Sequence, residues 1–320
     1  MQELITALRS AKRIAIVAHI RPDGDAAGSV ISLAHVLKQL GAETAAVLKD
    51  GVPSAFLFLE GSGDVVRELP SDYDLCVVVD APDTARTGFP QEIKAYAAAG
   101  KLALIDHHIK GDLIKRTDKV LYDENASSTA ELITLLIQEL NLKLTPAVST
   151  ALLTGMYTDT GGFQYGNTTN QTLEFASELM RRGGRLDRIV HQMSRQRSVA
   201  GLKLLGIALS RLTLTPDKLG AVTLISLEDL RSSNATAEDA TGLVNSLNVL
   251  PEVSYCLLLS ELEPGVVRGT LRTAEGRTYD VARLAALCGG GGHPRAAGFA
   301  ISGRLVASES GWRIEPALVS

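Results

Sequence analysis

Residues 17–29 read VAHIRPDGDAAGS, and the rest of the chain is organised around this stretch. The apolar run at residues 13–18 is typical of a buried strand, and it leads directly into His19. A proline and a glycine then interrupt regular structure, while Asp23 and Asp25 place two carboxylates within six residues of the imidazole. Imidazole and carboxylate groups in one loop resemble half of a metal site, so the rest of the chain must supply the other half.

Beyond this loop, apolar strands alternate with helices that have one apolar face. Strands are expected over residues 43–48, 74–80 and 101–105, and helices over residues 30–40, 91–99, 127–140 and 147–157. This alternation is typical of βαβ units. The pattern therefore predicts an α/β domain with a doubly wound parallel sheet.

Two of these strands end in residues that carry chemistry. One ends in Asp80, and the next runs into Asp106, His107 and His108. In a doubly wound sheet, ligands bind beyond the carboxyl ends of the strands. A single Asp after a strand is usually a turn former, but hydrophobic packing gives no reason for two adjacent histidines there. Together with His19, three strand ends indicate one site.

The side chains expected to meet at this site are His19, Asp23, Asp25, Asp80, His107 and Asp159. Four carboxylates in one cleft repel one another unless cations neutralise them, and two divalent ions cancel four negative charges. Mixed imidazole and carboxylate ligands favour Mn²⁺ over Ca²⁺, with Mg²⁺ or Co²⁺ as substitutes, and Asp80 is the expected bridge between the ions. A bridged two-metal site suits the in-line hydrolysis of phosphate esters.

His108 is not needed as a metal ligand in this scheme. Two roles are open to it, and the sequence does not choose between them. It either acts on the substrate, by contacting the phosphate or by protonating the leaving oxygen, or it makes only a supporting hydrogen bond. The hydroxyl residues 127–129 precede Glu131 and are expected mainly to cap the helix that begins there.

The chain changes character after a charged, helical segment. Beyond that segment, β-branched strands are interleaved with shorter helices, which predicts a smaller α+β domain. The expected organisation is a catalytic domain over residues 1–190, a helical linker over residues 191–212 and a substrate-binding domain over residues 213–320.

The second domain contains a glycine-rich motif, GGGGHPRAAGF, at residues 289–299. Glycines let backbone N–H groups approach a phosphate closely, although flexible turns are the commoner use of such a run. A histidine and arginines close to the glycines favour binding of a base and a phosphate. The expected substrate-binding residues are Arg272, Gly290, Gly291, Gly292, His293 and Arg295.

The composition limits the partners. A formal net charge of −4 argues against a general electrostatic grip on long duplex nucleic acid, but it permits a small nucleotide in a local basic pocket. Three cysteines without CxxC spacing indicate reduced thiols. No secretory signal or membrane-spanning apolar stretch is evident, so we expect a soluble cytoplasmic protein that contacts no membrane.

The motifs at residues 19–29, at Asp80, at residues 106–108 and at Asp159 resemble the four motifs of the DHH phosphoesterase family. Residues 289–299 resemble the signature of its DHH-associated C-terminal domain. The resemblance covers nearly the whole chain and implies a phosphoesterase that depends on Mn²⁺.

The resemblance also implies how the residues divide between the two ions. One ion would be held by His19, Asp23 and Asp80, and the other by Asp25, Asp80, His107 and Asp159. His108 would then be the histidine that faces the substrate, and Asp106 would support the histidine pair without binding metal.

Within the family, two compact domains with nothing appended resemble the bacterial nanoRNase and pAp-phosphatase type. That type implies hydrolysis of short oligoribonucleotides and linear dinucleotides to mononucleotides, and of 3′-phosphoadenosine 5′-phosphate (pAp) to AMP. The alternatives are a cyclic-dinucleotide phosphodiesterase, an inorganic pyrophosphatase or an exopolyphosphatase. A homodimer is compatible with the family. The aromatic residues that flank Asp159, in the stretch YTDTGGF at residues 157–163, bear on the shape of the substrate pocket.

Overall fold

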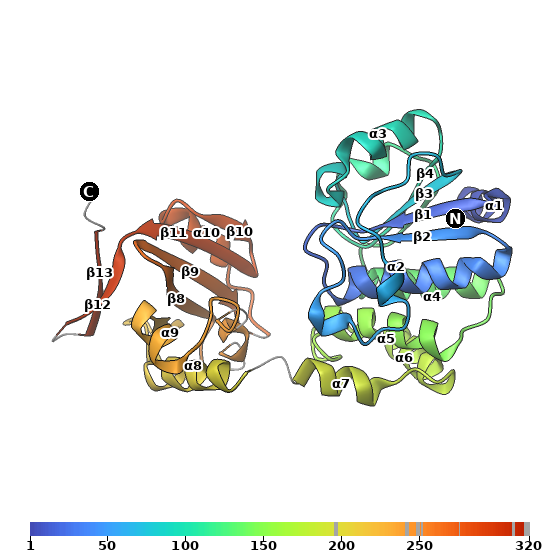
Figure 1. The fold of residues 1–320 in the computed structure, drawn as a ribbon. Coiled ribbons are helices and arrows are strands. Elements are labelled where there is room, and N and C mark those ends of the chain that lie inside the picture. Colours follow the sequence, from blue (N-terminus) through green and yellow to red (C-terminus); the bar gives the residue numbers. More distant parts are fainter. Residues whose placement is uncertain are drawn as a thin grey trace. The chain divides into compact units, whose positions relative to one another are not determined.

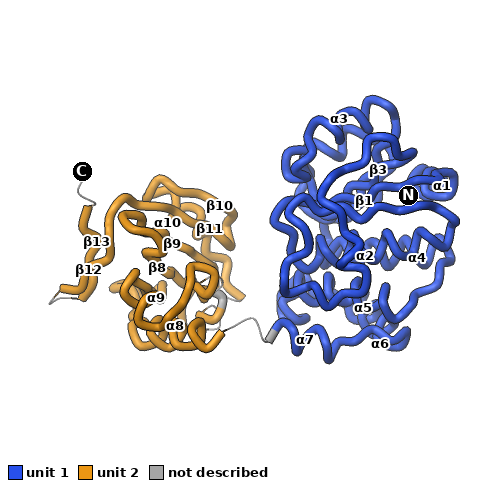
Figure 2. The backbone as a smooth tube through the Cα atoms, viewed as in Figure 1, with its two compact units in different colours: residues 1–194 blue, residues 195–320 orange. Residues whose placement is uncertain are grey.

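The computed structural model describes residues 1–194, 198–240, 243–247, 250, 252–274, 276–308 and 311–316. The chain divides into two compact units, residues 1–194 and residues 195–320 (Figure 2). Within the described residues, no helix has both the length and the apolar character needed to cross a membrane.

Unit 1 is built on a parallel five-stranded sheet in the order β2-β1-β3-β4-β5. The strands are β1 Arg13–Val17, β2 Glu43–Val47, β3 Leu75–Val79, β4 Leu102–Asp106 and β5 Val120–Tyr122. The helices are α1 Gln2–Ser10, α2 Gly24–Leu37, α3 Pro90–Ala98, α4 Thr129–Glu139, α5 Pro146–Asp159, α6 Asn170–Arg181 and α7 Leu186–Ser194. Short 3₁₀ turns are η1 Lys38–Leu40, η2 Ser54–Phe56, η3 Ser62–Asp64, η4 Thr84–Thr87 and η5 Leu113–Lys115.

Helices cover both faces of this sheet (Figure 1). Helix α3 lies on one face, where Ile93 packs against Ala15 and its neighbours. Helices α2 and α4 lie on the other face, and α5 to α7 form a further layer over them. Strands buried on both faces read as continuous apolar runs, as they do in this sequence. The predicted doubly wound α/β fold of this unit is confirmed.

Three details of unit 1 differ from the sequence prediction. Helix α2 begins at Gly24 instead of residue 30, because the carboxylate of Asp23 accepts the N–H groups of its first turn and caps it. Helix α5 continues as far as Asp159, two residues beyond the predicted end at residue 157. Strand β5 was not predicted, because its three residues are too few to show a period.

Unit 2 is a smaller α+β unit, which confirms the predicted class. Its described residues form a six-stranded mixed sheet in the order β10-β11-β9-β8-β7-β6 and a separate two-stranded sheet of β12 and β13. The strands are β6 Thr213–Leu214, β7 Gly220–Ile225, β8 Tyr255–Glu263, β9 Val266–Thr273, β10 Gly291–His293, β11 Ala296–Ser302, β12 Arg304–Ser308 and β13 Gly311–Glu315. The helices are α8 Val199–Ser210, α9 Leu227–Ser233, the 3₁₀ turn η6 Leu243–Ser246 and α10 Val281–Leu287.

The helical linker expected over residues 191–212 is divided between the two units. Helix α7 ends unit 1, and α8 belongs to unit 2. Leu204 and Ala208 of α8 are fully or almost fully buried against Ala221 and Ile225 of β7. Helix α8 is therefore part of the core of unit 2, because its apolar side needs that sheet to cover it.

Candidate metal centre

The candidate metal centre lies at the carboxyl edge of the sheet in unit 1. His19 follows β1 by two residues, Asp80 directly follows β3, and His107 directly follows β4. Asp80 adopts a left-handed backbone conformation, with φ of 57°, which L-residues rarely adopt away from functional sites and turns. The parallel sheet therefore brings together three side chains that are far apart in the sequence.

Two helix ends complete the centre. Asp23 and Asp25 lie at the start of α2, and Asp159 is the last residue of α5. These helices pack so closely that a Cβ on Gly28 would lie 2.3 Å from the backbone oxygen of Ala151. This close packing is the physical reason for glycine at position 28, and it fixes the position of Asp25.

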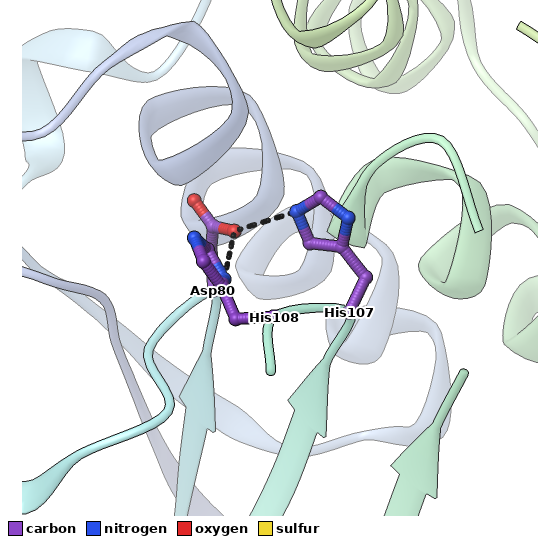
Figure 3. Close-up of side chains that lie close together, drawn as sticks. All are labelled: Asp80, His107 and His108. Carbon is purple, nitrogen blue, oxygen red and sulfur yellow. Dashed lines mark ion pairs between the residues drawn. The ribbon is translucent and has the colours of Figure 1, made fainter. Parts of the chain in front are cut away.

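Asp80 occupies the middle of the centre. Its Oδ2 atom lies 3.4 Å from Nε2 of His19. Its Oδ1 atom lies 3.7 Å from Nε2 of His107 and 3.7 Å from Nδ1 of His108 (Figure 3). The two oxygens of one carboxylate therefore face histidines from different strands, which is the arrangement that a bridging ligand requires.

The six expected ligands fall into two groups around this carboxylate. The possible ligand atoms of His19, Asp23 and Asp80 all lie within 4.8 Å of one another. The same limit holds for the group Asp25, His107 and Asp159, and for the group Asp80, His107 and His108. The structure thus brings all six expected residues together, and adds His108 close to Asp80.

His19 and His107 are oriented as metal ligands. Nδ1 of His19 lies 2.8 Å from the carbonyl oxygen of Ile20, and Nδ1 of His107 lies 3.2 Å from that of Ala126. Because a carbonyl oxygen only accepts, each Nδ1 carries a proton, so Nε2 is the atom of each ring that can bind a cation once its own proton is lost. Nε2 of His107 is buried and makes no well-directed hydrogen bond within the described residues, although Oδ2 of Asp159 lies 3.2 Å from it. A divalent cation fits this donor set.

The crowded carboxylates raise the pKa values of His19 and His107. Burial opposes a positive charge on His19, but the nearby carboxylates of Asp23 and Asp80 outweigh burial and raise its pKa to about 10. Burial also opposes a charge on His107, but the contact with Asp159 and the nearby carboxylates raise its pKa to about 10. In the absence of a cation, protons on these two rings compensate the carboxylates.

The carboxylates respond in opposite directions. Burial opposes ionisation of Asp80, but the surrounding histidines, His19 first, outweigh it and lower its pKa to about 2. Complete burial raises the pKa of Asp25, and the negative charges of Asp80 and Asp159 raise it further. Burial likewise raises the pKa of Asp159, although His107 offsets part of the effect. A bound cation stabilises buried carboxylates that repel one another in this way.

The start of α4 supports the centre, and sequence reasoning missed this role. The backbone N–H groups of Thr129 and Ala130 donate to the two oxygens of Asp25, over 2.6 Å and 2.9 Å. The hydroxyl of Thr129 donates to Oδ1 of Asp80 over 2.9 Å. The sequence showed a helix cap at these residues but gave no sign of the carboxylates that the cap would meet.

The start of α4 is itself anchored. Glu131 is 5% exposed and accepts hydrogen bonds from the hydroxyls of Ser127 and Thr172, over 2.5 Å and 2.7 Å. The amide of Asn167 donates to the carbonyl oxygens of Ser127 and Asp159, over 3.0 Å and 3.2 Å. These contacts join the end of α5 to the segment that supports Asp25 and Asp80.

His108 differs from the other two histidines. Its Nδ1 atom lies 2.9 Å from Oδ1 of the buried Asp106, so the carboxylate fixes the orientation of the ring. Its side chain is 32% exposed, against 15% for His107. Of the two rings, His108 is therefore the one better placed to exchange a proton with a bound molecule.

The expected substrate-binding residues lie together on the sheet of unit 2. The glycine motif is a β-hairpin of β10 and β11 and not only a loop: Gly292 pairs with Ala297, and His293 with Ala296. Strand β9 places Arg272 opposite Ala296. Gly292 has φ of 146°, and a Cβ there would lie 2.5 Å from the oxygen of Ala296, so a side chain would not fit.

Comparisons with known proteins agree on a family. The family described as "DHH family, N-terminal domain" matches residues 13–157. The "bifunctional oligoribonuclease and PAP phosphatase NrnA" of Thermus thermophilus is 31% identical over 294 residues, which cover 91% of this chain and 84% of that protein. The protein of the same description from Bacillus subtilis is 28% identical over 302 residues, covering 93% of this chain and 92% of its own.

A solved structure supports the fold of both units. The crystal structure of an exopolyphosphatase-related protein from Bacteroides fragilis matches with a TM-score of 0.84 and 26% sequence identity. The match covers 93% of this chain and 91% of that one.

Proposed function

The chain belongs to the DHH family and is a hydrolase of phosphate esters, and from this premise we propose its substrates and its metals. It hydrolyses short oligoribonucleotides and linear dinucleotides to mononucleotides, and pAp to AMP. Two Mn²⁺ ions serve the reaction, and Mg²⁺ or Co²⁺ are the expected substitutes. The observation that carries the proposal is the position of Asp80 between two groups of possible metal ligands.

The proposed ligands follow these two groups. His19, Asp23 and Asp80 hold one ion, and Asp25, Asp80, His107 and Asp159 hold the other. Neutral imidazole with carboxylate oxygen suits Mn²⁺, while the absence of thiolate from the set argues against structural zinc. The bound ions supply Lewis acidity toward the phosphate and lower the pKa of the attacking water.

The protein's own residues then direct the reaction. Water attacks phosphorus, and the bond between phosphorus and the ester oxygen breaks. His108, held by Asp106, donates the proton that the leaving oxygen needs. Thr129 holds Asp80 in place during this exchange.

Unit 2 is proposed to bind the nucleotide. The side chains of His293 and Arg295, both within the glycine hairpin, are exposed, and Arg272 lies on strand β9, which pairs with β11. These groups suit a base and a phosphate, and they are too few for a long duplex. The three cysteines are free thiols, which supports the cytoplasm as the compartment. A homodimer stays a prediction.

One assay tests the proposal. Purified protein with Mn²⁺ is given linear dinucleotides, cyclic dinucleotides, pAp, pyrophosphate and polyphosphate side by side. The proposal expects mononucleotides from linear dinucleotides and AMP from pAp, at rates well above those for the other compounds. Faster turnover of pyrophosphate or polyphosphate would instead assign the alternative activity, and faster turnover of cyclic dinucleotides would assign a phosphodiesterase.

A further inference from the structure

The segment that follows Asp159 has an unusual backbone. Gly161, Gly162 and Phe163 adopt left-handed conformations in succession, with φ of 58°, 74° and 67°. A phenylalanine avoids this region because its Cβ crowds the neighbouring carbonyl oxygen. Such conformations persist only where surrounding contacts enforce them, and they cluster at binding and catalytic sites.

Hydrogen bonds enforce this turn. Thr160 accepts the N–H groups of Gln164 and Tyr165 at its carbonyl oxygen, both over 2.9 Å. Its hydroxyl accepts the N–H of Phe163 over 2.9 Å. The N–H of Gly162 donates to the carbonyl oxygen of Tyr157 over 2.7 Å. The turn is therefore a defined structure and not a loose connection.

The turn supports the ring of Tyr165 from one side. A Cβ added to Gly161 would lie 2.3 Å from Cζ of Tyr165, so the ring rests on the backbone of that glycine. Tyr165 is nevertheless 50% exposed. Part of an aromatic ring is therefore open to solvent, although the ring is held in place from below.

The neighbouring aromatic residues are packed inward. The rings of Tyr157 and Phe163 meet edge to face, with centroids 5.9 Å apart, and both pack against the core of unit 1. Tyr165 is the most exposed of these three aromatic residues. The ring of Tyr165 is therefore exposed to solvent, while Tyr157 and Phe163 pack the turn against the core.

The segment that carries this ring is connected to the metal centre through Asp159. Asp159, a proposed metal ligand, precedes Gly161 by two residues. The amide of Asn167, two residues after Tyr165, donates to the carbonyl oxygen of Asp159 over 3.2 Å. The segment from Asp159 to Asn167 therefore carries the exposed ring, and a hydrogen bond joins its last residue to its first.

We propose that the exposed part of the Tyr165 ring stacks against a nucleobase of the substrate whose phosphate reacts at the metal centre. This inference rests on the proposed function and specifies its substrate class further. Stacking on an aromatic ring accepts every base, because each has a π-face. Pyrophosphate and polyphosphate have no flat group for such a ring to bind, so the ring favours nucleotides.

The test combines variants of Tyr165 with a modified substrate. Wild type, Tyr165→Ala and Tyr165→Phe are assayed on a linear dinucleotide, and on two analogues that each lack one base. For Tyr165→Ala we expect KM for the dinucleotide to rise about tenfold, as for the loss of one stacked base. Tyr165→Phe keeps the ring and stays near wild type. With the analogue that lacks the stacked base, wild type and Tyr165→Ala converge.

Controls separate base binding from a structural role. Tyr73 lies just before β3, at the opposite edge of the sheet, so Tyr73→Ala serves as the matched tyrosine variant and leaves KM unchanged. The affinity of Tyr165→Ala for Mn²⁺, measured by calorimetry, stays that of wild type. A loss of Mn²⁺ affinity, or an equal rise in KM with all three substrates, would overturn the proposal.

A binding measurement keeps this result distinct from failure of the proposed function. A dinucleotide that contains the fluorescent base 2-aminopurine and a methylenephosphonate linkage, which is not hydrolysed, is titrated with protein in Mg²⁺. Quenching by wild type that is lost in Tyr165→Leu supports the stacking, even if dinucleotides are not cleaved. Equal quenching by both proteins would contradict it, and so would no quenching by wild type.

Discussion

The hydroxyl of Thr129 donates a hydrogen bond to Oδ1 of Asp80 over 2.9 Å, although the two residues are 49 positions apart. The backbone N–H of the same threonine donates to Asp25 over 2.6 Å. One residue at the start of α4 therefore holds two of the proposed metal ligands.

Removing that hydroxyl should weaken metal binding. Thr129→Val keeps the shape of the side chain but leaves Asp80 without its donor. We expect the affinity for Mn²⁺ to fall about tenfold to a hundredfold, the usual cost of losing a residue that orients a ligand. Thr129→Ser should retain most of the affinity. Isothermal titration calorimetry measures both.

Thr134 provides the control for this change. It lies on the same helix, is buried, and donates its hydroxyl to the backbone oxygen of Ala130 over 2.8 Å. Thr134→Val should leave the affinity for Mn²⁺ unchanged. An equal loss in both variants would mean that α4 had been disturbed as a whole.

Replacing the central carboxylate should remove activity. Asp80→Asn takes a negative charge from the position that both proposed ion sites share. We expect turnover to fall by more than about a hundredfold, which is the upper range for residues that only support ligands. The affinity of unit 2 for nucleotide should persist. Steady-state assays and nucleotide titrations check the two outcomes.

Asp72 is the matched aspartate. Its side chain is 68% exposed and pairs with Arg13, away from the metal centre. Asp72→Asn should retain normal turnover. Near-normal turnover in Asp80→Asn would remove the bridging assignment.

His108 should matter most for substrates with poor leaving groups. His108→Ala is expected to lower turnover of dinucleotides by about 10² to 10⁴, the usual contribution of a positioned proton donor. A p-nitrophenyl ester, whose leaving group needs no proton, should lose far less. The affinity of the His108→Ala variant for Mn²⁺ should stay near that of wild type. Equal losses on both substrates would favour the supporting role for His108.

Metal binding should strengthen as the pH rises. In the metal-free protein, the pKa values of His19 and His107 are raised to about 10, so both rings are protonated at neutral pH. The charged rings stabilise the metal-free fold at low pH, and that contribution is lost as the pH rises through about 10. Because a metal ion binds neutral imidazole, its affinity should rise about tenfold per pH unit for each proton released.

Calorimetry in buffers of different ionisation enthalpy counts these protons. The wild type should release protons from both rings on binding Mn²⁺ at neutral pH. His107→Gln should release fewer than wild type. Binding without proton release would show that the rings were already neutral.

The close contact between α2 and α5 should make the protein sensitive to a larger residue at position 28. In Gly28→Ala the new Cβ would lie 2.3 Å from the backbone oxygen of Ala151, so the helices must separate. We expect the free energy of unfolding to fall by about 1–3 kcal/mol, as for other overpacked cores. Urea denaturation followed by circular dichroism measures it. Gly63→Ala, where a Cβ meets nothing within 4 Å, should change little.

The sequence by itself predicted much of this protein, because its signals are local. Apolar runs predicted four of the strands of unit 1, and the polar residues after them indicated the carboxyl edge of the sheet. The residue types of His19, Asp80 and His107 indicated a metal site, because hydrophobic packing gives no reason for polar residues at these positions. The motifs together predicted the family, which the comparisons confirm.

Only the tertiary structure decided how these side chains are held. The start of α2 at Gly24 depends on the capping bonds that Asp23 makes. The contact of Thr129 with Asp80 depends on how α4 packs against the sheet, and no spacing in the sequence encodes it. The placement of Tyr165 on Gly161 likewise depends on a turn of left-handed residues. Residue types and periods are local properties of a chain, whereas hydrogen-bond partners across many residues are set by packing.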